Sequence, residues 1–154
     1  MSGADFDLDR FLAAQDAQGA YEQALTELRA GAKRTHWMWF VFPQIAGLGR
    51  SETARRYAIG SLAEARAYLA HPLLGPRLRE SAQALCSLAP GREAAQVLGP
   101  VDALKLRSCM TLFELAAPEE PVFAAVLERY YRGERDTATL DLLSAGGAPE
   151  RRRP

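Results

Sequence analysis

The segment that ends at Ser51 combines residue types that can bind an anion. Its sequence is QIAGLGRS, in which the candidate ligand-binding residues are Gln44, Gly47, Gly49, Arg50 and Ser51. Glycine lets a backbone turn tightly and approach a ligand closely, and a serine that begins a helix leaves the first backbone amides pointing outward. An arginine there adds a forked donor for a phosphate or carboxylate. The pattern predicts an anion site, although an ordinary turn before a capped helix has the same residues.

A second arginine would strengthen this site. Arg55 or Arg56 follows the helix start by about one turn, so either side chain could reach an anion bound at the turn. The alternative is that these arginines are simply solvated.

The aromatic run before the turn, THWMWFVFP, supports two interpretations. Trp37 and Trp39 could line a small-molecule site and stack on a ring, or they could belong to the core. Alternate residues of a helix cannot all face one core, so we expect one tryptophan or His36 to point toward the turn that contains Gly47 and Gly49, called the glycine turn. His36 could act as an acid or base near neutral pH, or it could be a hydrogen-bonded structural residue.

Polar residues also recur on an otherwise apolar helical segment, VDALKLRSCMTLFELA. Asp102, Lys105 and Ser108 are spaced by three residues and share one side of a helix. A lysine in apolar surroundings can serve as a nucleophile or base. The alternative is a surface ion pair between Asp102 and Lys105, with the lysine stem covering apolar surface.

Several functional classes are excluded by what the chain lacks. Its two histidines and two cysteines are too scattered for a spacing-defined zinc site, so we expect no metal and no cofactor. There is no H-E-x-x-H, G-K-[ST] or G-x-S-x-G motif, and GLGRS lacks the third glycine of a dinucleotide fingerprint. With 19 basic and 19 acidic side chains, the chain has no broad positive field for nucleic-acid binding.

Length and composition indicate one soluble domain. The chain has 154 residues, of which 48% are hydrophobic, and no apolar run approaches the roughly 20 residues of a membrane-spanning helix. No secretory signal is evident at the N-terminus, so we expect a cytoplasmic protein. Cys86 and Cys109 stand among apolar neighbours and are expected to be buried free thiols.

Apolar side chains recur every three or four residues, which predicts helices. The expected helices are one capped by Asp7, one from about Ala20 to Gly31, one from Leu62 to His71 after an S-x-x-E capping box at Ser61, one through Leu78 and Leu88, a short one over Ala94–Leu98, a central one over Val101–Ala117, one from Pro121 to Gly133, and one over Thr137–Leu143 capped by Asp136. For residues 36–42 we favour a short helix with Thr35 as its N-cap and Pro43 as its exit, because a lone strand would have no partner. The fold class is therefore all-α: a compact, single-domain, multi-helix orthogonal bundle around the central apolar helix, covering residues 1–143, with a disordered tail over 144–154.

Three strings of the sequence resemble one bacterial family. RTHWMWFVFPQIAGLGRS, YAIGSLAEARAYLAHPLLGPRL and DALKLRSCMTLF are similar to the family catalogued as domain of unknown function 1810, sometimes labelled calpastatin. The resemblance covers roughly Phe6 to Leu143 and implies a compact, mainly helical domain without an established activity. The calpastatin label implies a protease inhibitor, but such an inhibitor would be a disordered, repeated chain.

A more distant similarity bears on chemistry. The order of EARAYLAHPLLGPRL and KLRSCMTLFE looks like the motif order of NADAR (YbiA-like) helical domains, which are associated with ADP-ribose chemistry. That resemblance implies that Gly75 and Arg77 match the first motif and Lys105 the later helix. The spacing between the motifs differs, and the tryptophan-rich middle motif of that family is missing.

These observations lead to a functional hypothesis. The protein binds a small phosphorylated, nucleotide-like ligand and cleaves an N-glycosidic bond in an ADP-ribosyl group, with Lys105 or His36 as the catalytic residue. The ligand-binding residues would be Trp37, Trp39, Gln44, Gly47, Gly49, Arg50, Ser51, Arg77 and Ser108. The alternative is a non-catalytic helical module that binds a small metabolite or a protein, and a third hypothesis is a purely structural domain. The oligomeric state stays open.

Overall fold

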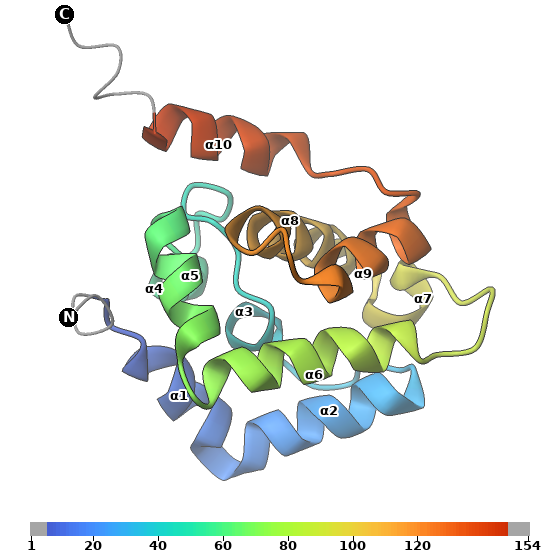
Figure 1. Cartoon of the computed structure of the whole chain (residues 1–154). Helices are drawn as coiled ribbons and strands as arrows, with labels where there is room; N and C mark the ends of the chain where they lie inside the picture. The colour runs from blue at the N-terminus through green and yellow to red at the C-terminus, as the bar shows by residue number, and fades with distance from the viewer. Residues whose placement is uncertain (1–5, 148–154) are drawn as a thin grey trace, which may run out of the picture.

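The computed structural model describes residues 6–147, and these residues form a bundle of helices (Figure 1). The elements are α1 (Asp9–Asp16), the 3-10 helix η2 (Ala17–Gly19), α2 (Ala20–Ala30), α3 (Met38–Val41), α4 (Glu52–Arg56), α5 (Leu62–Ala70), α6 (Leu74–Cys86), α7 (Ala94–Leu98), α8 (Pro100–Ala116), α9 (Pro121–Tyr131) and α10 (Thr137–Gly147). Within the described residues, β pairing is limited to a parallel bridge between Ile45 and Ile59. The all-α prediction is confirmed. In the same part of the chain, every helix is too short or too polar to cross a bilayer.

Helix α8 forms the centre of the bundle, as its apolar sequence predicts. Pro100 occupies its first turn, where the missing N–H costs no helical hydrogen bond. The helix packs against α5, α7, α9 and α10, and α6 packs against α2, α5 and α9 (Figure 1). Its fully buried side chains include Leu106, Cys109, Leu112 and Phe113. The first turns differ from the prediction, because Val101 and Leu104 are exposed.

Helices α5 and α6 approach each other closely at Gly75. A Cβ atom at this position would lie 2.1 Å from the carbonyl oxygen of Leu69. Arg79, one turn further along α6, donates to the same carbonyl at 3.3 Å and forms a two-point ion pair with Glu120 at 2.6 and 2.8 Å. Gly75 therefore has a packing reason to be glycine.

Helix α1 begins without a side-chain cap, so the prediction of Asp7 as its N-cap is wrong. Leu8 occupies the N-cap position instead. The carbonyl of Asp7 accepts a hydrogen bond from the guanidinium of Arg10, and this contact holds Asp7 in the turn before the helix.

The aromatic segment forms the short helix α3, which confirms the helical prediction for Met38–Val41. The predicted N-cap is wrong, because Trp37 and not Thr35 precedes the helix. Thr35 donates its backbone N–H and its hydroxyl to the carboxylate of Glu27, at 3.1 and 2.7 Å. Glu27 thus engages the side chain that was expected to cap α3.

Two other helix starts follow their sequence signals. The hydroxyl of Ser51 accepts the N–H of Ala54 at 3.1 Å, and the hydroxyl of Ser61 accepts the N–H of Glu64 at the same distance. The predicted capping box is only half formed, because the Glu64 carboxylate accepts from Gly60 at 2.8 Å and not from Ser61.

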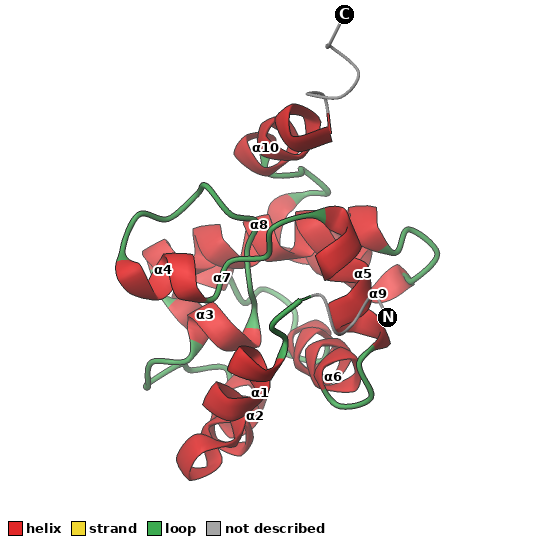
Figure 2. Ribbon diagram, turned by 90° about the vertical axis from the view of Figure 1, so that its left-hand side faces the viewer, coloured by secondary structure: helices red, strands yellow, loops and turns green. Residues whose placement is uncertain are grey.

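The last helix is anchored to α8 through Asp136. Its carboxylate accepts the N–H of Thr139 at 3.0 Å and the hydroxyl of Ser108 at 3.1 Å. The predicted cap at Asp136 is confirmed. Figures 1 and 2 both show α10 on the outer side of α8.

Helix α10 is longer than predicted. It continues to Gly147 instead of ending at Leu143. Leu142 and Leu143 pack against the core, which holds this part of the helix on the bundle. The predicted tail is therefore helical over 144–147, and its remainder, 148–154, lies outside the described residues.

Candidate functional site

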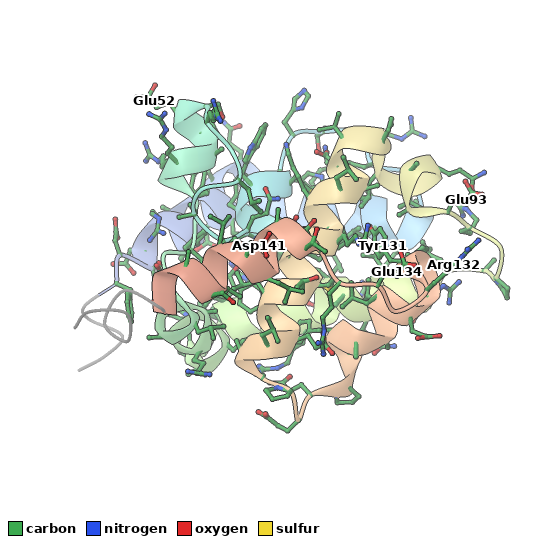
Figure 3. The ribbon with its side chains drawn as sticks, turned by 90° about the horizontal axis from the view of Figure 1, so that it is seen from above. Glu52, Glu93, Tyr131, Arg132, Glu134 and Asp141 are labelled. Atoms are coloured by element: carbon green, nitrogen blue, oxygen red, sulfur yellow. The ribbon has the colours of Figure 1, made fainter. Side chains whose placement is uncertain are left out.

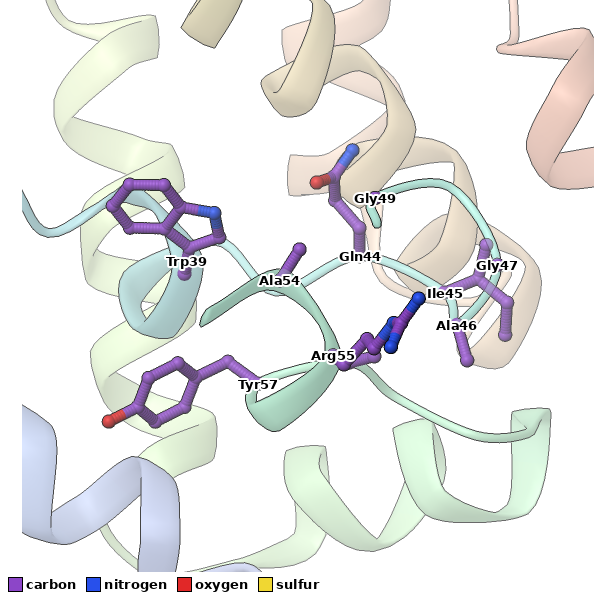
Figure 4. Close-up of a pocket in the computed structure, with 10 residues that line it drawn as sticks. Trp39, Gln44, Ile45, Ala46, Gly47, Gly49, Ala54, Arg55 and Tyr57 are labelled. Atoms are coloured by element: carbon purple, nitrogen blue, oxygen red, sulfur yellow. The ribbon is translucent and has the colours of Figure 1, made fainter. Parts of the chain in front are cut away.

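A pocket of about 110 Å³ lies between α3, α4 and the glycine turn (Figure 4). Its lining includes Trp39, Gln44, Gly47, Gly49, Arg55 and Tyr57. The structure therefore brings one residue of the aromatic run to the glycine turn, as the sequence predicts. Arg55 comes from α4, one helical turn after the Ser51 cap.

A single parallel bridge closes the loop that forms the pocket. The N–H of Ile59 donates to the carbonyl of Gln44, and the N–H of Ala46 donates to the carbonyl of Ile59, both at 2.8 Å. The glycine turn and α4 lie between these paired segments in the sequence. The pairing therefore fixes where both of them stand.

The two glycines of the turn are needed for different reasons. Gly47 has a φ of +105°, a backbone conformation that side-chain-bearing residues rarely adopt. Gly49 approaches α4 so closely that a Cβ atom would lie 2.4 Å from the Cβ of Ala54. The positive φ of Gly47 fits the predicted tight turn, and the close approach at Gly49 is to α4, whereas the predicted approach to a ligand stays a prediction.

Arg10, on α1, supports the far end of the same loop. Its guanidinium donates to the carbonyls of Arg56 and Ala58, both at 2.6 Å, and forms an ion pair with Glu64 at 3.0 Å. Nothing local in the sequence marks this role, because the partners are more than 40 residues away.

Three polar groups at the pocket lack a protein partner among the described residues. They are the indole N–H of Trp39, the carboxamide of Gln44 and the guanidinium of Arg55. Because no buried side-chain nitrogen or oxygen in that part of the chain lacks a hydrogen bond, these groups are open to solvent. Figure 4 shows the indole nitrogen on the side of the ring that faces Gln44, whereas the Tyr57 hydroxyl points away.

The segment that supplies Arg55 to the pocket is basic. Arg50, Arg55 and Arg56 are all exposed. The nearby acidic residue, Glu52, is also exposed and lies at the edge of the molecule (Figure 3). Arg50 follows Gly49 directly without lining the pocket. The segment from Arg50 to Arg56 thus carries a net charge of +2 from three arginines and one glutamate.

Trp37 is a core residue, so its prediction as a stacking residue is wrong. Its side chain is 1% exposed, and its indole N–H donates to Glu27 at 2.8 Å. Burial by itself would raise the pKa of Glu27, but hydrogen bonds from Arg34, Gln23, Trp37 and Thr35 outweigh it and lower the pKa to about 2. A charged carboxylate therefore fixes Trp37 in place.

Lys105 stands behind Trp39. Its ammonium group lies 4.4 Å from the centre of the Trp39 ring and 3.4 Å from the carboxylate of Asp102. The alternative that these residues form an ion pair is confirmed. Lys105 contacts the wall of the pocket without belonging to its lining.

The other predicted site residues lie apart from the pocket lining. His36 is exposed on the loop before α3. Arg77 pairs with Asp16 at 3.0 Å and donates to Gln15 at 3.2 Å, which links α6 to α1. Ser108 donates to Asp136 and so serves the anchoring of α10. The catalytic assignment of Lys105 and His36 stays a prediction.

Tyr57 was missed as a lining residue. Its ring packs beside Phe11 and Phe40, with ring centres 6.0 and 5.6 Å away. No local pattern marks Tyr57, since its place depends on the bridge between Ile45 and Ile59.

The donor set of the pocket suits an anion. Trp39 and Arg55 offer N–H groups, and a metal ion needs electron-pair donors instead. Within residues 6–147, no three histidine, cysteine or acidic side chains gather as metal ligands.

Comparison with known proteins defines the class of the chain. Residues 5–143 match the family described as "Protein of unknown function (DUF1810)". The chain belongs to this family, as the three resembling strings suggest. A comparison with curated proteins found no match.

One solved structure is similar over nearly the whole chain. It is the crystal structure of the conserved hypothetical protein Rv1873 from Mycobacterium tuberculosis, with 51% sequence identity and a TM-score of 0.87. The match covers 91% of this chain and 98% of that chain. The likeness supports the fold but, like the family match, it does not indicate an activity.

Proposed function

We propose that the protein binds a small phosphorylated ligand, with the phosphate in the pocket between Trp39, the glycine turn and α4. The observation that carries this proposal is the set of three unpaired polar groups on Trp39, Gln44 and Arg55, which face one pocket. These groups converge on one pocket and are not engaged by other side chains, so they are available to hydrogen-bond a ligand there.

Charge favours an anion as that ligand. Arg55 lines the pocket itself, and Arg50 and Arg56 are exposed residues that directly follow the lining residues Gly49 and Arg55 in the sequence. A guanidinium donates two parallel hydrogen bonds to a phosphate or carboxylate, which fixes the orientation of the group.

Volume limits how much of the ligand is enclosed. Pockets that enclose a whole drug-sized molecule measure roughly 300–1,000 Å³. A volume of about 110 Å³ accepts one group, such as a phosphate or a single ring. We therefore propose that the remainder of a nucleotide-like ligand extends out of the pocket into solvent.

We propose binding without turnover. Glycoside hydrolysis generally uses a pair of carboxylates beside the scissile bond, and none of the described lining residues is acidic. Lys105 is engaged by Asp102 and Trp39. The alternative hypothesis is hydrolysis of an ADP-ribosyl N-glycoside. This hypothesis predicts that Lys105→Ala abolishes release of the free base.

Calorimetric titration with inorganic phosphate, AMP, ADP-ribose and uncharged adenosine tests the proposal. We expect saturable binding of the three phosphorylated compounds, and none of adenosine. Arg55→Gln removes a charged hydrogen-bond donor and should weaken binding about tenfold.

The matched control is Arg56→Gln, which changes a neighbouring exposed arginine that does not line the pocket. This variant should bind within about twofold of the natural chain, because only long-range charge is lost. Equal affinity of the two variants, or no binding of any phosphorylated compound at millimolar concentration, would refute the proposed site.

A further inference from the structure

Two ammonium groups share one carboxylate beside the pocket. Asp102 lies 3.0 Å from the Nζ atom of Lys33 through one oxygen and 3.4 Å from the Nζ atom of Lys105 through the other. Two positive charges and one negative charge leave this cluster with a net charge of +1.

Each ammonium group also lies against a tryptophan ring. The Lys33 nitrogen is 5.1 Å from the centre of the Trp37 ring, and the Lys105 nitrogen is 4.4 Å from that of Trp39. At these distances the cation is attracted to the electron-rich face of the indole. The cluster therefore connects the buried tryptophan with the one that lines the pocket.

The Lys33 half of the cluster is the fixed half. The backbone N–H of Lys33 donates to the carbonyl of Val97 at 2.7 Å, and its side chain is 10% exposed. Trp37, under that ammonium group, is held by Glu27. Asp102 stands in the first turn of α8, where the helix dipole favours a negative charge.

Lys105 is held less tightly than Lys33. Its side chain is 22% exposed, its distance to Asp102 is the longer of the two, and the ring beneath it borders the pocket. Lys105 lies one helical turn after Asp102, so the carboxylate can hold its ammonium group in one place.

We propose that Asp102 is a positioning residue for the pocket: it holds Lys105 on the Trp39 ring and thereby fixes the indole that forms the pocket wall. The effect of this arrangement on ligand binding rests on the proposed function, whereas the positioning itself does not. Lys33 fixes the carboxylate, the carboxylate fixes Lys105, and Lys105 fixes Trp39.

The chain has two tryptophans, so its indole N–H groups give two signals in a ¹⁵N–¹H correlation spectrum. Trp39→Phe assigns them. Without ligand, Asp102→Asn and Lys105→Met should each move the Trp39 signal by several times more than the Trp37 signal. In the double variant, the Trp39 signal should stand where Lys105→Met alone puts it, because Asp102 acts through Lys105.

Glu114→Gln is the matched control. Glu114 is also on α8, its side chain is 17% exposed like that of Asp102, and it pairs with Arg135 at 2.8 Å. This change should leave both indole signals in place. Asp102→Glu keeps the carboxylate, so the Trp39 signal should lie close to its position in the natural chain. If Asp102→Asn does not fold, Asp102→Ser, which also lacks the carboxylate, takes its place in the single and the double variant.

The proposal is overturned if the Trp39 signal does not move in Lys105→Met. It is also overturned if the Asp102→Asn shift persists undiminished without Lys105. Titrating the natural chain with inorganic phosphate separates this inference from the proposed function. Variants that behave as stated, with no response to phosphate, would support the positioning role and reject phosphate binding.

Discussion

The carboxylate of Glu27 accepts the indole N–H of Trp37 at 2.8 Å, and this bond ties α2 to the start of α3. The same carboxylate accepts the backbone N–H of Arg34 at 2.8 Å and two bonds from Thr35. One buried side chain thus fixes the loop before α3 and, two residues after Trp37, the position of Trp39 at the pocket.

Replacing Glu27 by glutamine should make the protein less stable and less sensitive to acid. The folded state lowers the pKa of this carboxyl from 4.5 to about 2. A lowered pKa contributes stability above pH 4.5, and this contribution is lost as the pH falls toward 2. At pH 7 it amounts to roughly 3 kcal/mol.

Urea unfolding at a series of pH values checks this prediction. The natural chain should lose stability relative to Glu27→Gln between pH 4.5 and 2. Glu22→Gln, an exposed change on the same helix, should alter stability by less than about 0.5 kcal/mol at pH 7. A constant difference between Glu27→Gln and the natural chain over this pH range would contradict the assignment.

Replacing Arg10 by methionine should destabilise the fold by roughly 3 kcal/mol, because it leaves the carboxylate of Glu64 without its ion-pair partner in a buried setting. The side chain of Glu64 is 8% exposed. Adding Glu64→Gln should recover part of the loss, as measured by thermal unfolding of both single variants and the double variant. Strictly additive losses would show that the two residues do not act together.

Replacing Gly75 by alanine should destabilise the protein by more than about 2 kcal/mol through overpacking. Helix propensity alone predicts the opposite sign, a gain of up to about 1 kcal/mol. The clash of the new Cβ with the carbonyl of Leu69 decides between them. In Gly60→Ala, whose nearest contact would be an ordinary 3.4 Å, the denaturation midpoint should stay almost unchanged. A stabilised Gly75→Ala would mean that α5 and α6 separate easily.

The two thiols should react very differently with Ellman's reagent. Cys109 is fully buried, and burial raises its pKa well above the usual range, so it should react only after unfolding. Cys86 is half-buried with a pKa also raised by burial, so it should react slowly at pH 7 and faster as the pH rises. Cys86→Ser should abolish the native reaction, and reaction of both thiols at one rate would contradict this picture.

Local signals in the sequence predicted much of the helical framework. Ser51, Ser61 and Asp136 each cap a helix by bonding to an N–H three residues ahead, which depends on local geometry alone. The apolar run of α8 identified the central helix for the same reason. Thr35 failed as a cap because a residue eight positions earlier engages its side chain.

The sequence predicted only those parts of the site whose residues are close together in the chain. Gly47, Gly49, Gln44 and Trp39 lie within one short stretch, and their types indicate a turn beside an aromatic wall. Which tryptophan faces the pocket depends on Glu27, and Trp39 takes its other contact from α8. Such contacts between distant segments leave no periodic trace in the sequence.

The contact between Gly47 and Leu142 bears on how the pocket comes into being. A Cβ atom at Gly47 would lie 3.0 Å from the Leu142 side chain, so the last helix rests on the turn that forms the pocket. A ribosome releases the N-terminal part of a chain first. Trp39, the turn and α4 all leave the ribosome before Leu142, so during synthesis the turn has no support from α10 until Leu142 has emerged.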